Sequence, residues 1–318
     1  MAGPKLKIVS SQGGELAQLV DDWLADGRAR GWTPASQDAA RDRVQKLFLP
    51  WLIERGITTS AQLDQEVVNA YSRYLLEEHR TPKGTPLSRE SVRSYMRHVR
   101  VFAKWSQERG SLEGFKVPMP PAPKRVLDVL TRQEMRAIEA HALSERDQLV
   151  IALLSETGMR LGELLKLRPQ DLKRQGNERY LHVRGKGNRE RLVAIGPKLF
   201  VRLEKYSKRP QLDEASTSAL FTADRRTDGH YSPLSARGVQ QLVRYAARRA
   251  GIREGKVNPH LFRHSFATYR LNNGYPIKHL QDDLGHADLS MLTKVYSHVT
   301  ASDRYKSMLA LMRKEEDE

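Results

Sequence analysis

The sequence predicts a mainly α-helical protein with a small β-sheet, organised as a helical bundle followed by a mixed α+β domain. Residues 15–114 repeat apolar positions three and four apart, which is the period of an amphipathic helix. Residues 179–195 instead form two short segments around a Gly-rich turn, which is typical of a β-hairpin. Residues 115–127 hold four prolines within six positions, so they cannot be helical. This segment separates the two parts of the chain.

Four helices are expected in the first part of the chain, preceded by a flexible N-terminus at residues 1–14. The second helix starts at Thr33-Pro34, because proline suits the first turn of a helix. The four are expected at residues 15–31, from Pro34 to Trp51, at 63–79 and at 87–109. Helices of this size predict a small bundle over residues 15–114.

The fourth predicted helix carries basic residues at spacings of three and four, which places them in one stripe along its surface. Val92, Met96, Val99 and Ala103 form the neighbouring apolar face. A row of like charges repels itself unless counter-charge is near, and nucleic-acid phosphates would supply that charge. An ordinary solvated face is the alternative interpretation. The stripe consists of Arg89, Arg93, Arg97, Arg100 and Lys104.

Residues 115–130 are expected to be an extended linker between the two domains. Lys124 and Arg125 lie within this linker. We expect both side chains to touch a nucleic-acid backbone.

The charge of the chain points to a polyanionic partner. Its 54 Lys and Arg outnumber its 38 Asp and Glu, which gives a formal net charge of +16 and a pI near 10.0. Most of the excess follows residue 123, where there are 36 basic and 24 acidic residues. A protein with this excess of positive charge attracts nucleic acid electrostatically, although a soluble basic protein with another function would show the same excess.

The chain has no cysteine, which excludes disulfides and thiolate metal sites and fits a reducing cytoplasm. No apolar run approaches the ~20 residues of a membrane span. The segment MAGPKLKIVSSQGG has no signal-peptide core. We therefore expect a cytoplasmic protein without a membrane partner.

The second part is expected to combine helices with a small sheet. Thr131 and Glu134 have the spacing of a capping box at the start of one helix, and Gly158 ends a buried helix at residues 146–157. Strands are expected at residues 179–184, 189–195 and 219–223, in one sheet.

A helix expected at residues 235–251 is rich in arginine and glutamine, which can read guanine and adenine edges, respectively. We therefore expect this helix to lie in or near a DNA groove. The residues concerned are Arg237, Gln240, Gln241, Arg244, Arg248 and Arg249.

Four stretches of the second part carry the groups that can do chemistry. They are ETGMRLGELLKL at 156–167, VRGKGNRERLVAI at 183–195, HLFRHSFAT at 260–268 and LGHADLSMLTKVYSHV at 284–299. They supply a phenol, two guanidiniums, an amine and two imidazoles, without a carboxylate pair or a thiol. Such a set suits attack on a phosphodiester by a phenol, with the phosphate charge held by protein cations instead of a metal. The six residues are Arg160, Lys186, His260, Arg263, His286 and Tyr296.

The order of these six residues resembles the tyrosine recombinase, or integrase, family, and is most similar to its bacterial Xer and transposon or phage integrase branches. The resemblance covers about residues 131–300. It implies that Tyr296 attacks a DNA phosphate, forms a 3′-phosphotyrosyl link and releases a 5′-hydroxyl. The 5′-hydroxyl of another strand then reseals the link, by way of a Holliday junction and without ATP.

The resemblance also assigns a role to each residue. Arg160 and Arg263 would bind the non-bridging phosphate oxygens through bidentate hydrogen bonds. Lys186 would protonate the leaving 5′ oxygen, a general acid contribution of about 10²–10⁴ in rate. His260 would shuttle the tyrosine proton and His286 would donate to the phosphate. Glu163 would orient these groups.

The resemblance further implies an assembly. The N-terminal bundle would clamp DNA from the side opposite a catalytic domain at residues 131–303. The tail, residues 304–318, would dock on a neighbouring protomer in a ring of four around two DNA duplexes. Its apolar residues need a surface on which to be buried, and the tail's own domain is the alternative surface. They are Met308, Leu309, Leu311 and Met312.

The chain departs from the family pattern at one spacing. His286 and Tyr296 are ten residues apart, whereas many members have nine. A transposon-type branch resembles the longer spacing, so we expect the chain to be active. Tyr269 and Tyr305 are competing tyrosines, but only Tyr296 matches the position of the nucleophile.

Other interpretations remain open at this point. Glu163 could form an ordinary ion pair with Lys166. His260 and His264 are four residues apart, as in some zinc sites, but the chain lacks the glutamate and cysteines that would complete one. We therefore expect no metal and no cofactor. A type IB topoisomerase-like enzyme that nicks and closes one strand, and a DNA-binding relative without activity, are the alternative functions.

Overall fold

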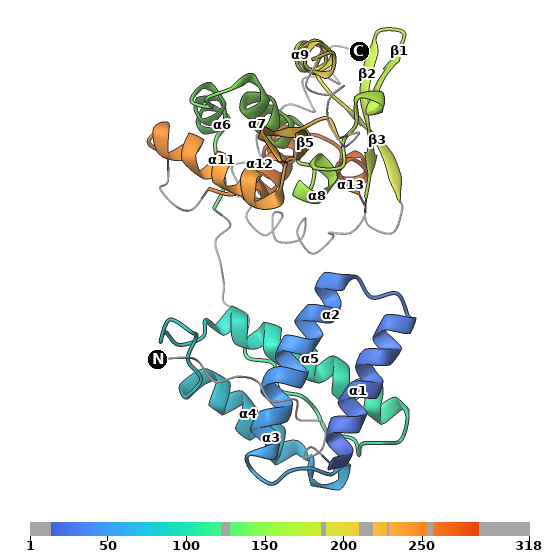
Figure 1. Ribbon diagram of the computed structural model, residues 1–318. Coiled ribbons are helices and arrows are strands. Elements are labelled where there is room, and N and C mark those ends of the chain that lie inside the picture. The colour runs from blue at the N-terminus through green and yellow to red at the C-terminus, as the bar shows by residue number, and fades with distance from the viewer. Residues whose placement is uncertain are drawn as a thin grey trace, which may run out of the picture. The chain divides into compact units, whose positions relative to one another are not determined.

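The computed structural model describes residues 14–121, 128–185, 189–209, 219–227, 229–252 and 257–285. The chain divides into two compact units, Met1–Arg125 and Val126–Glu318. Helices make up most of the described residues of each unit, and the described strands form two small antiparallel sheets in the second unit (Figure 1). This confirms the predicted fold class. Residues 1–13 of the flexible N-terminus expected at 1–14, and the tail at residues 304–318, lie outside the described residues, and Gly14 is the first residue of a helix.

The first unit is a bundle of helices around an aromatic core. Trp23, Phe48, Tyr71 and Phe102 are at most 1% exposed. The ring pairs Trp23–Phe102 and Phe48–Tyr71 pack at 5.5 and 4.6 Å between centroids. Each buried side chain of this size contributes roughly 1.5–3 kcal/mol. The helices are α1 (Gly14–Ala29), α2 (Pro34–Ala40), η1 (Arg41–Phe48), α3 (Leu49–Ile53), η2 (Ser60–Gln62), α4 (Gln65–Glu77) and α5 (Arg89–Glu108).

The helix predicted from Pro34 is continuous but contains a π-helical segment, η1. Thr33 caps its start by accepting a hydrogen bond from the backbone amide of Ser36. At its end, the amide of Leu49 donates to the carbonyl of Val44, five residues back. Pro50 explains the wider turn, because proline has no amide hydrogen and its ring crowds the carbonyl four residues earlier.

The amphipathic pattern of α5 is as predicted. Ser88 caps the helix, its hydroxyl accepting from the Ser91 amide at 3.1 Å. The predicted apolar residues are all buried, with at most 2% of each side chain exposed. The bundle therefore packs against one face of α5, and the basic residues lie on its other faces.

The second unit contains the remaining elements. They are α6 (Arg132–Ala140), α7 (Glu145–Thr157), α8 (Leu161–Leu164), η3 (Pro169–Asp171), β1 (Leu172–Gln175), β2 (Glu178–Arg184), β3 (Glu190–Ala194), α9 (Pro197–Ser207), β4 (Thr222–Thr227), β5 (His230–Pro233), α11 (Ala236–Arg249), α12 (Pro259–Asn272) and α13 (Ile277–Leu284). The capping box at Thr131 and Glu134 is present, with both reciprocal hydrogen bonds at 3.1 Å or less.

The central helix of this unit is α7. Residues 149–154 are at most 2% exposed, which confirms the buried helix predicted there. It ends at Gly158, whose φ of 59° is left-handed. A Cβ at this position would lie 2.5 Å from Cδ1 of Phe266 on α12. Only glycine fits, because both the backbone conformation and the packing exclude a side chain.

The predicted β-hairpin is present, but the third strand of its sheet is not the one expected. The sheet order is β1-β2-β3, with Val183 opposite Arg191 in the second pair. The segment expected to join it, residues 219–223, instead leads into β4, which pairs with β5 in a separate sheet. β1 is the third strand of this sheet because a tight turn at Gly176 links it directly to β2. Closing so short a loop costs little conformational entropy when the two strands pair.

Within the described residues, no helix is long and apolar enough to cross a membrane.

Candidate active site

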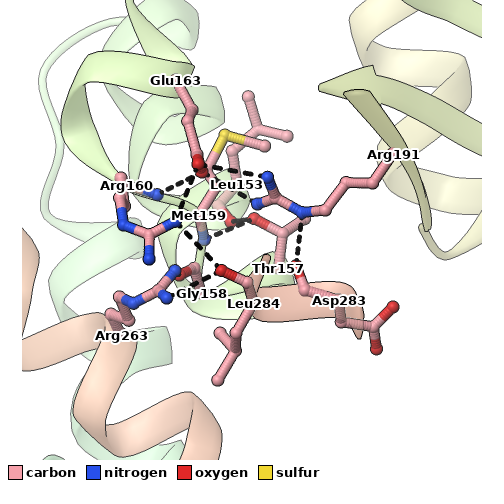
Figure 2. A network of polar contacts seen from close by, with 10 residues as sticks. All are labelled: Leu153, Thr157, Gly158, Met159, Arg160, Glu163, Arg191, Arg263, Asp283 and Leu284. Atoms are coloured by element: carbon pink, nitrogen blue, oxygen red, sulfur yellow. Dashed lines mark hydrogen bonds and ion pairs between the residues drawn. The ribbon is translucent and has the colours of Figure 1, made fainter. Parts of the chain in front are cut away.

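Arg160 and Arg263 come from different elements and meet at one place in the second unit (Figure 2). Arg160 is the N-cap residue of α8, two residues after Gly158, which ends α7. Arg263 lies in the second turn of α12. Both guanidiniums donate to the carbonyl oxygen of Leu284, at 3.1 and 2.8 Å. The structure thus brings together the two arginines that the sequence placed in the site.

Arg263 is a buried cation, with only 1% of its surface exposed. Its Nη1 donates to the Gly158 carbonyl and its Nη2 to the Leu284 carbonyl, each at 2.8 Å. These carbonyls lie at the C-terminal ends of α7 and α13, where helix carbonyls lack intrahelical partners and the dipole is negative. Two helix ends therefore compensate the buried charge.

Glu163 contacts Arg160 and is 4% exposed. Its Oε2 accepts from the backbone amide of Arg160 at 2.8 Å, and its Oε1 accepts from the Arg160 side chain at 3.0 Å. Burial alone would raise the pKa of Glu163, but hydrogen bonds from Arg191 and Arg160 outweigh burial and lower the pKa below 4.5. The partners of this carboxylate in the described residues are Arg160 and Arg191, which disfavours the alternative interpretation of an ion pair with Lys166.

Arg191 on β3 is a further residue of the site, which was not predicted from the sequence. Its Nη2 and Nη1 donate to the two oxygens of Glu163 at 2.8 and 3.1 Å, and its Nε donates to the Asp283 carbonyl at 2.7 Å. A signal was present in the sequence. Arg191 and the buried Val193 are two residues apart, so both side chains lie on the same, core-facing side of the strand. Charged residues are rare on such a face unless they are paired.

His260 shares a cavity with the two arginines. The cavity has a volume of about 390 Å³. His260 lies in the first turn of α12, and its ring packs edge-to-face on that of His264 at 4.3 Å between centroids. In the described part of the chain, no three His, Cys, Asp or Glu side chains gather as a metal site would require. The cavity is lined by Met159, Arg160, Leu161, Gln240, Asn258, Pro259, His260 and Arg263.

Three of the six predicted residues lie outside the described residues. Lys186 follows Gly185 at the end of β2, and His286 follows Gly285 at the end of α13. Tyr296 comes ten residues later. Gly185 and Gly285, the last described residues before Lys186 and His286, both lie at the site. A Cβ on Gly185 would be 3.5 Å from Oε1 of Glu163, and a Cβ on Gly285 would be 3.4 Å from Nη1 of Arg160.

The predicted DNA-binding residues of the bundle differ in their surroundings. Arg89, Arg97, Arg100 and Lys104 are exposed along α5, and Lys104 pairs with Glu108 at 3.6 Å. Arg93 is half-buried and donates to the carbonyl of Pro120 instead of pointing freely to solvent. Lys124 and Arg125 lie outside the described residues.

The basic and amide residues of α11 are exposed on one helix. Val239, Val243, Ala246 and Ala247 form its buried face. Gln240 also lines the cavity that holds Arg160, so this helix borders the candidate site. The exposed residues are Arg237, Gln240, Gln241, Arg244, Arg248 and Arg249.

Known proteins with similar sequences are tyrosine recombinases. Residues 128–303 match the phage integrase family. The chain is 31% identical to tyrosine recombinase XerC 2 of Ralstonia nicotianae, over 94% of this chain and 87% of that one. It is 27% identical to tyrosine recombinase XerD of Listeria innocua, over 89% of this chain and 94% of that one.

Solved structures share the fold. The integrase of transposon Tn1549 in complex with transposon right end DNA has a TM-score of 0.68 at 17% identity, over 94% of this chain and 98% of that one. XerH recombinase bound to a palindromic difH substrate has a TM-score of 0.67 at 18% identity, over 93% of this chain and 85% of that one. From its sequence match, this chain belongs to the phage integrase family of tyrosine recombinases, enzymes that cleave and rejoin DNA.

Proposed function

We propose that this chain is a site-specific recombinase that exchanges DNA strands through a 3′-phosphotyrosyl intermediate, with Tyr296 as the nucleophile. The observation that carries the proposal is the convergence of Arg160, His260 and Arg263 on one cavity. Two guanidiniums held on a common carbonyl form a preorganised positive site, which is what the extra charge on a phosphorane-like transition state requires.

The remaining roles follow from the chemistry of each group. Attack by the Tyr296 oxygen forms the phosphotyrosyl bond and breaks the bond to the 5′ oxygen. The phenolic proton leaves by way of His260, and Lys186 gives a proton to the departing 5′ oxygen. His286 donates to a non-bridging oxygen. Glu163 holds Arg160 in place.

The domain roles belong to the same proposal. Residues 15–114 would bind DNA through the exposed part of the α5 stripe, and residues 131–303 would form the catalytic domain, joined by the linker at 115–130. Double-stranded DNA would also contact α11, which exposes arginines and glutamines and contributes Gln240 to the lining of the cavity. Arg93 contributes less than its neighbours in this view, because Pro120 already engages it.

Covalent trapping on a nicked suicide substrate tests the nucleophile. The wild-type chain should form a protease-sensitive protein–DNA adduct, because the short strand diffuses away after cleavage and resealing cannot occur. Tyr296→Phe loses only the phenolic oxygen, so it should form no adduct and keep its DNA affinity. Tyr305→Phe is the matched control and should react like wild type. An adduct with Tyr296→Phe would show that another residue attacks.

The reaction products separate recombination from a topoisomerase activity. Two duplexes with matching sites should yield a Holliday junction and exchanged strands. Relaxed circles without any junction would favour the topoisomerase-like alternative.

We further propose that four protomers assemble on two duplexes, with the tail at residues 304–318 docked on a neighbour. A groove of about 350 Å³ beside α11 offers an apolar surface, on which Leu143 and Tyr245 are 81% and 57% exposed. Arg248 borders this groove, and the tail combines apolar residues with the acidic end Glu315–Glu318. Complementary charge supports this pairing.

Truncation of residues 304–318 tests the assembly. Binding of one protomer to a half-site should stay nearly intact, whereas cooperative complexes and strand exchange should be lost in a gel-shift titration. Wild-type recombination by the truncated chain would contradict docking in trans.

A further inference from the structure

Arg191 stands outside the six residues that the proposed function uses, yet it touches the site from a third element (Figure 2). Its side chain is 12% exposed. The two Nη atoms donate to the two carboxylate oxygens of Glu163 at 2.8 and 3.1 Å. Such a bidentate pair fixes both the position and the rotation of the carboxylate.

The same two oxygens hold Arg160. Oε1 of Glu163 accepts from Nη1 of Arg160 at 3.0 Å, and Oε2 accepts from the Arg160 backbone amide at 2.8 Å. Each oxygen is therefore shared between the two arginines. The orientation of the Arg160 guanidinium depends on a carboxylate whose own orientation is set by Arg191.

We propose that Arg191 is a positioning residue that, through Glu163, aims the Arg160 guanidinium at the scissile phosphate. The inference rests on the proposed function, because it assumes that Arg160 binds that phosphate. It adds a residue to the site and identifies the group that orients Glu163.

Charge adds a second reason. Glu163 is 4% exposed, and a buried carboxylate without a cation is strongly unfavourable. Arg191 and Arg160 together carry two positive charges against one negative charge, so one positive charge remains for the phosphate. Without Arg191, Arg160 would be the remaining described cation on Glu163, and this pair would offer the phosphate no net charge.

Arg191 also lies on the hairpin that leads to Lys186, so an effect through Lys186 must be distinguished. The other strand of this hairpin has its own anchor, in which Nη2 of Arg184 donates to Oδ2 of Asp171 at 2.6 Å. Asp171 is 2% exposed. Arg184→Gln therefore loosens the same hairpin without touching Glu163, and it serves as the matched control.

The test is single-turnover adduct formation by the full chain on the nicked suicide substrate. Arg191→Gln should react about 10- to 100-fold more slowly, the range typical of groups that orient the ligands of a catalytic metal. Arg191→Lys keeps the positive charge but loses the planar guanidinium that binds both carboxylate oxygens, so it should recover part of the rate. Arg174→Gln on β1 removes an exposed contact to Glu204 at 3.6 Å and should change little.

Two further measurements identify the route. In a Glu163→Gln background, adding Arg191→Gln should cost little more, because the two residues act as one unit. A 5′-bridging sulfur at the scissile phosphate should not rescue Arg191→Gln, because a thiolate replaces only the acid step. Arg184→Gln, whose defect would lie on the Lys186 hairpin, should be rescued by that substrate.

If the wild-type chain forms the adduct and Arg191→Gln forms it at the same rate, the inference is overturned and the proposed function still stands. Rescue of Arg191→Gln by the sulfur substrate would also overturn it, since the defect would then lie at Lys186. If the wild-type chain forms no adduct at all, the proposed function fails instead. Thermal unfolding checks each variant, and Arg191→Lys carries the comparison if Arg191→Gln does not fold.

Discussion

Arg160 and Arg263 donate hydrogen bonds to the same atom, the carbonyl oxygen of Leu284 (Figure 2). Leu284 is the last residue of α13, and Gly285 follows with a left-handed φ of 75°. The shared acceptor fixes the two guanidiniums relative to each other before any substrate binds. A pair of cations fixed in this way loses little entropy on binding a phosphate, which is the basis of electrostatic preorganisation.

Replacing either arginine with alanine should slow cleavage strongly. Loss of one preorganised donor typically costs about 2.7–4 kcal/mol of barrier, or roughly 10²–10³ in rate. Single-turnover cleavage of the suicide substrate measures the effect for Arg160→Ala and Arg263→Ala. Arg263→Ala should also lower stability, because Arg263 is buried and bonds two helix ends. A rate close to that of wild type would exclude the clamp role for that residue.

Gly158→Ala should destabilise the second unit. The new Cβ would meet Phe266 Cδ1 at 2.5 Å in a left-handed conformation, which predicts a loss of about 2–5 kcal/mol in the free energy of unfolding. Gly176→Ala is the matched control, since its φ is 53° and no atom lies within 4 Å of the added Cβ. That control should lose only about 1–2 kcal/mol from backbone strain. Equal losses in urea unfolding would show that the contact with Phe266 is unimportant.

The stability that Glu163 contributes should depend on pH. Its pKa is lowered in the folded chain, since the hydrogen bonds from Arg191 and Arg160 outweigh burial. The contribution is therefore fully present above pH 4.5 and is lost as the pH falls through the lowered folded pKa. Urea unfolding of wild type and Glu163→Gln at several pH values should show a gap that narrows in acid. A gap that is independent of pH would contradict this.

Lys186→Ala should slow cleavage of ordinary DNA and recover on a substrate with a 5′-bridging sulfur. A thiolate leaves without being protonated, so the general acid, worth about 10²–10⁴ in rate, is no longer needed. Adduct formation on the two substrates measures the rescue. A defect of equal size on both would limit Lys186 to DNA binding.

Cleavage should not require a divalent metal. Arg160 and Arg263 supply the positive charge that a metal ion supplies in other phosphoryl-transfer sites. Adduct formation in excess EDTA should match that in magnesium buffer. A strict magnesium requirement for the cleavage step itself would contradict the role of the two arginines.

The sequence alone determined the class of the fold, most of the helices and the family to which the chain belongs. The reason is that these features depend on local patterns. The apolar period of α5, the capping box at Thr131 and the turn at Gly158 are each set by residues a few positions apart. Arg160 and the pair His260 and Arg263 were found by motif order, which also needs no knowledge of distances.

The tertiary structure decided what those residues touch. The strand that completes the sheet is β1 instead of residues 219–223, because pairing depended on which segment the chain brings alongside. Arg93 was placed on an exposed stripe by its spacing, but the chain after α5 returns to it at Pro120. Arg191 reaches Glu163 from 28 residues away. Contacts between segments so distant in sequence depend on packing and buried charge, which no local pattern records.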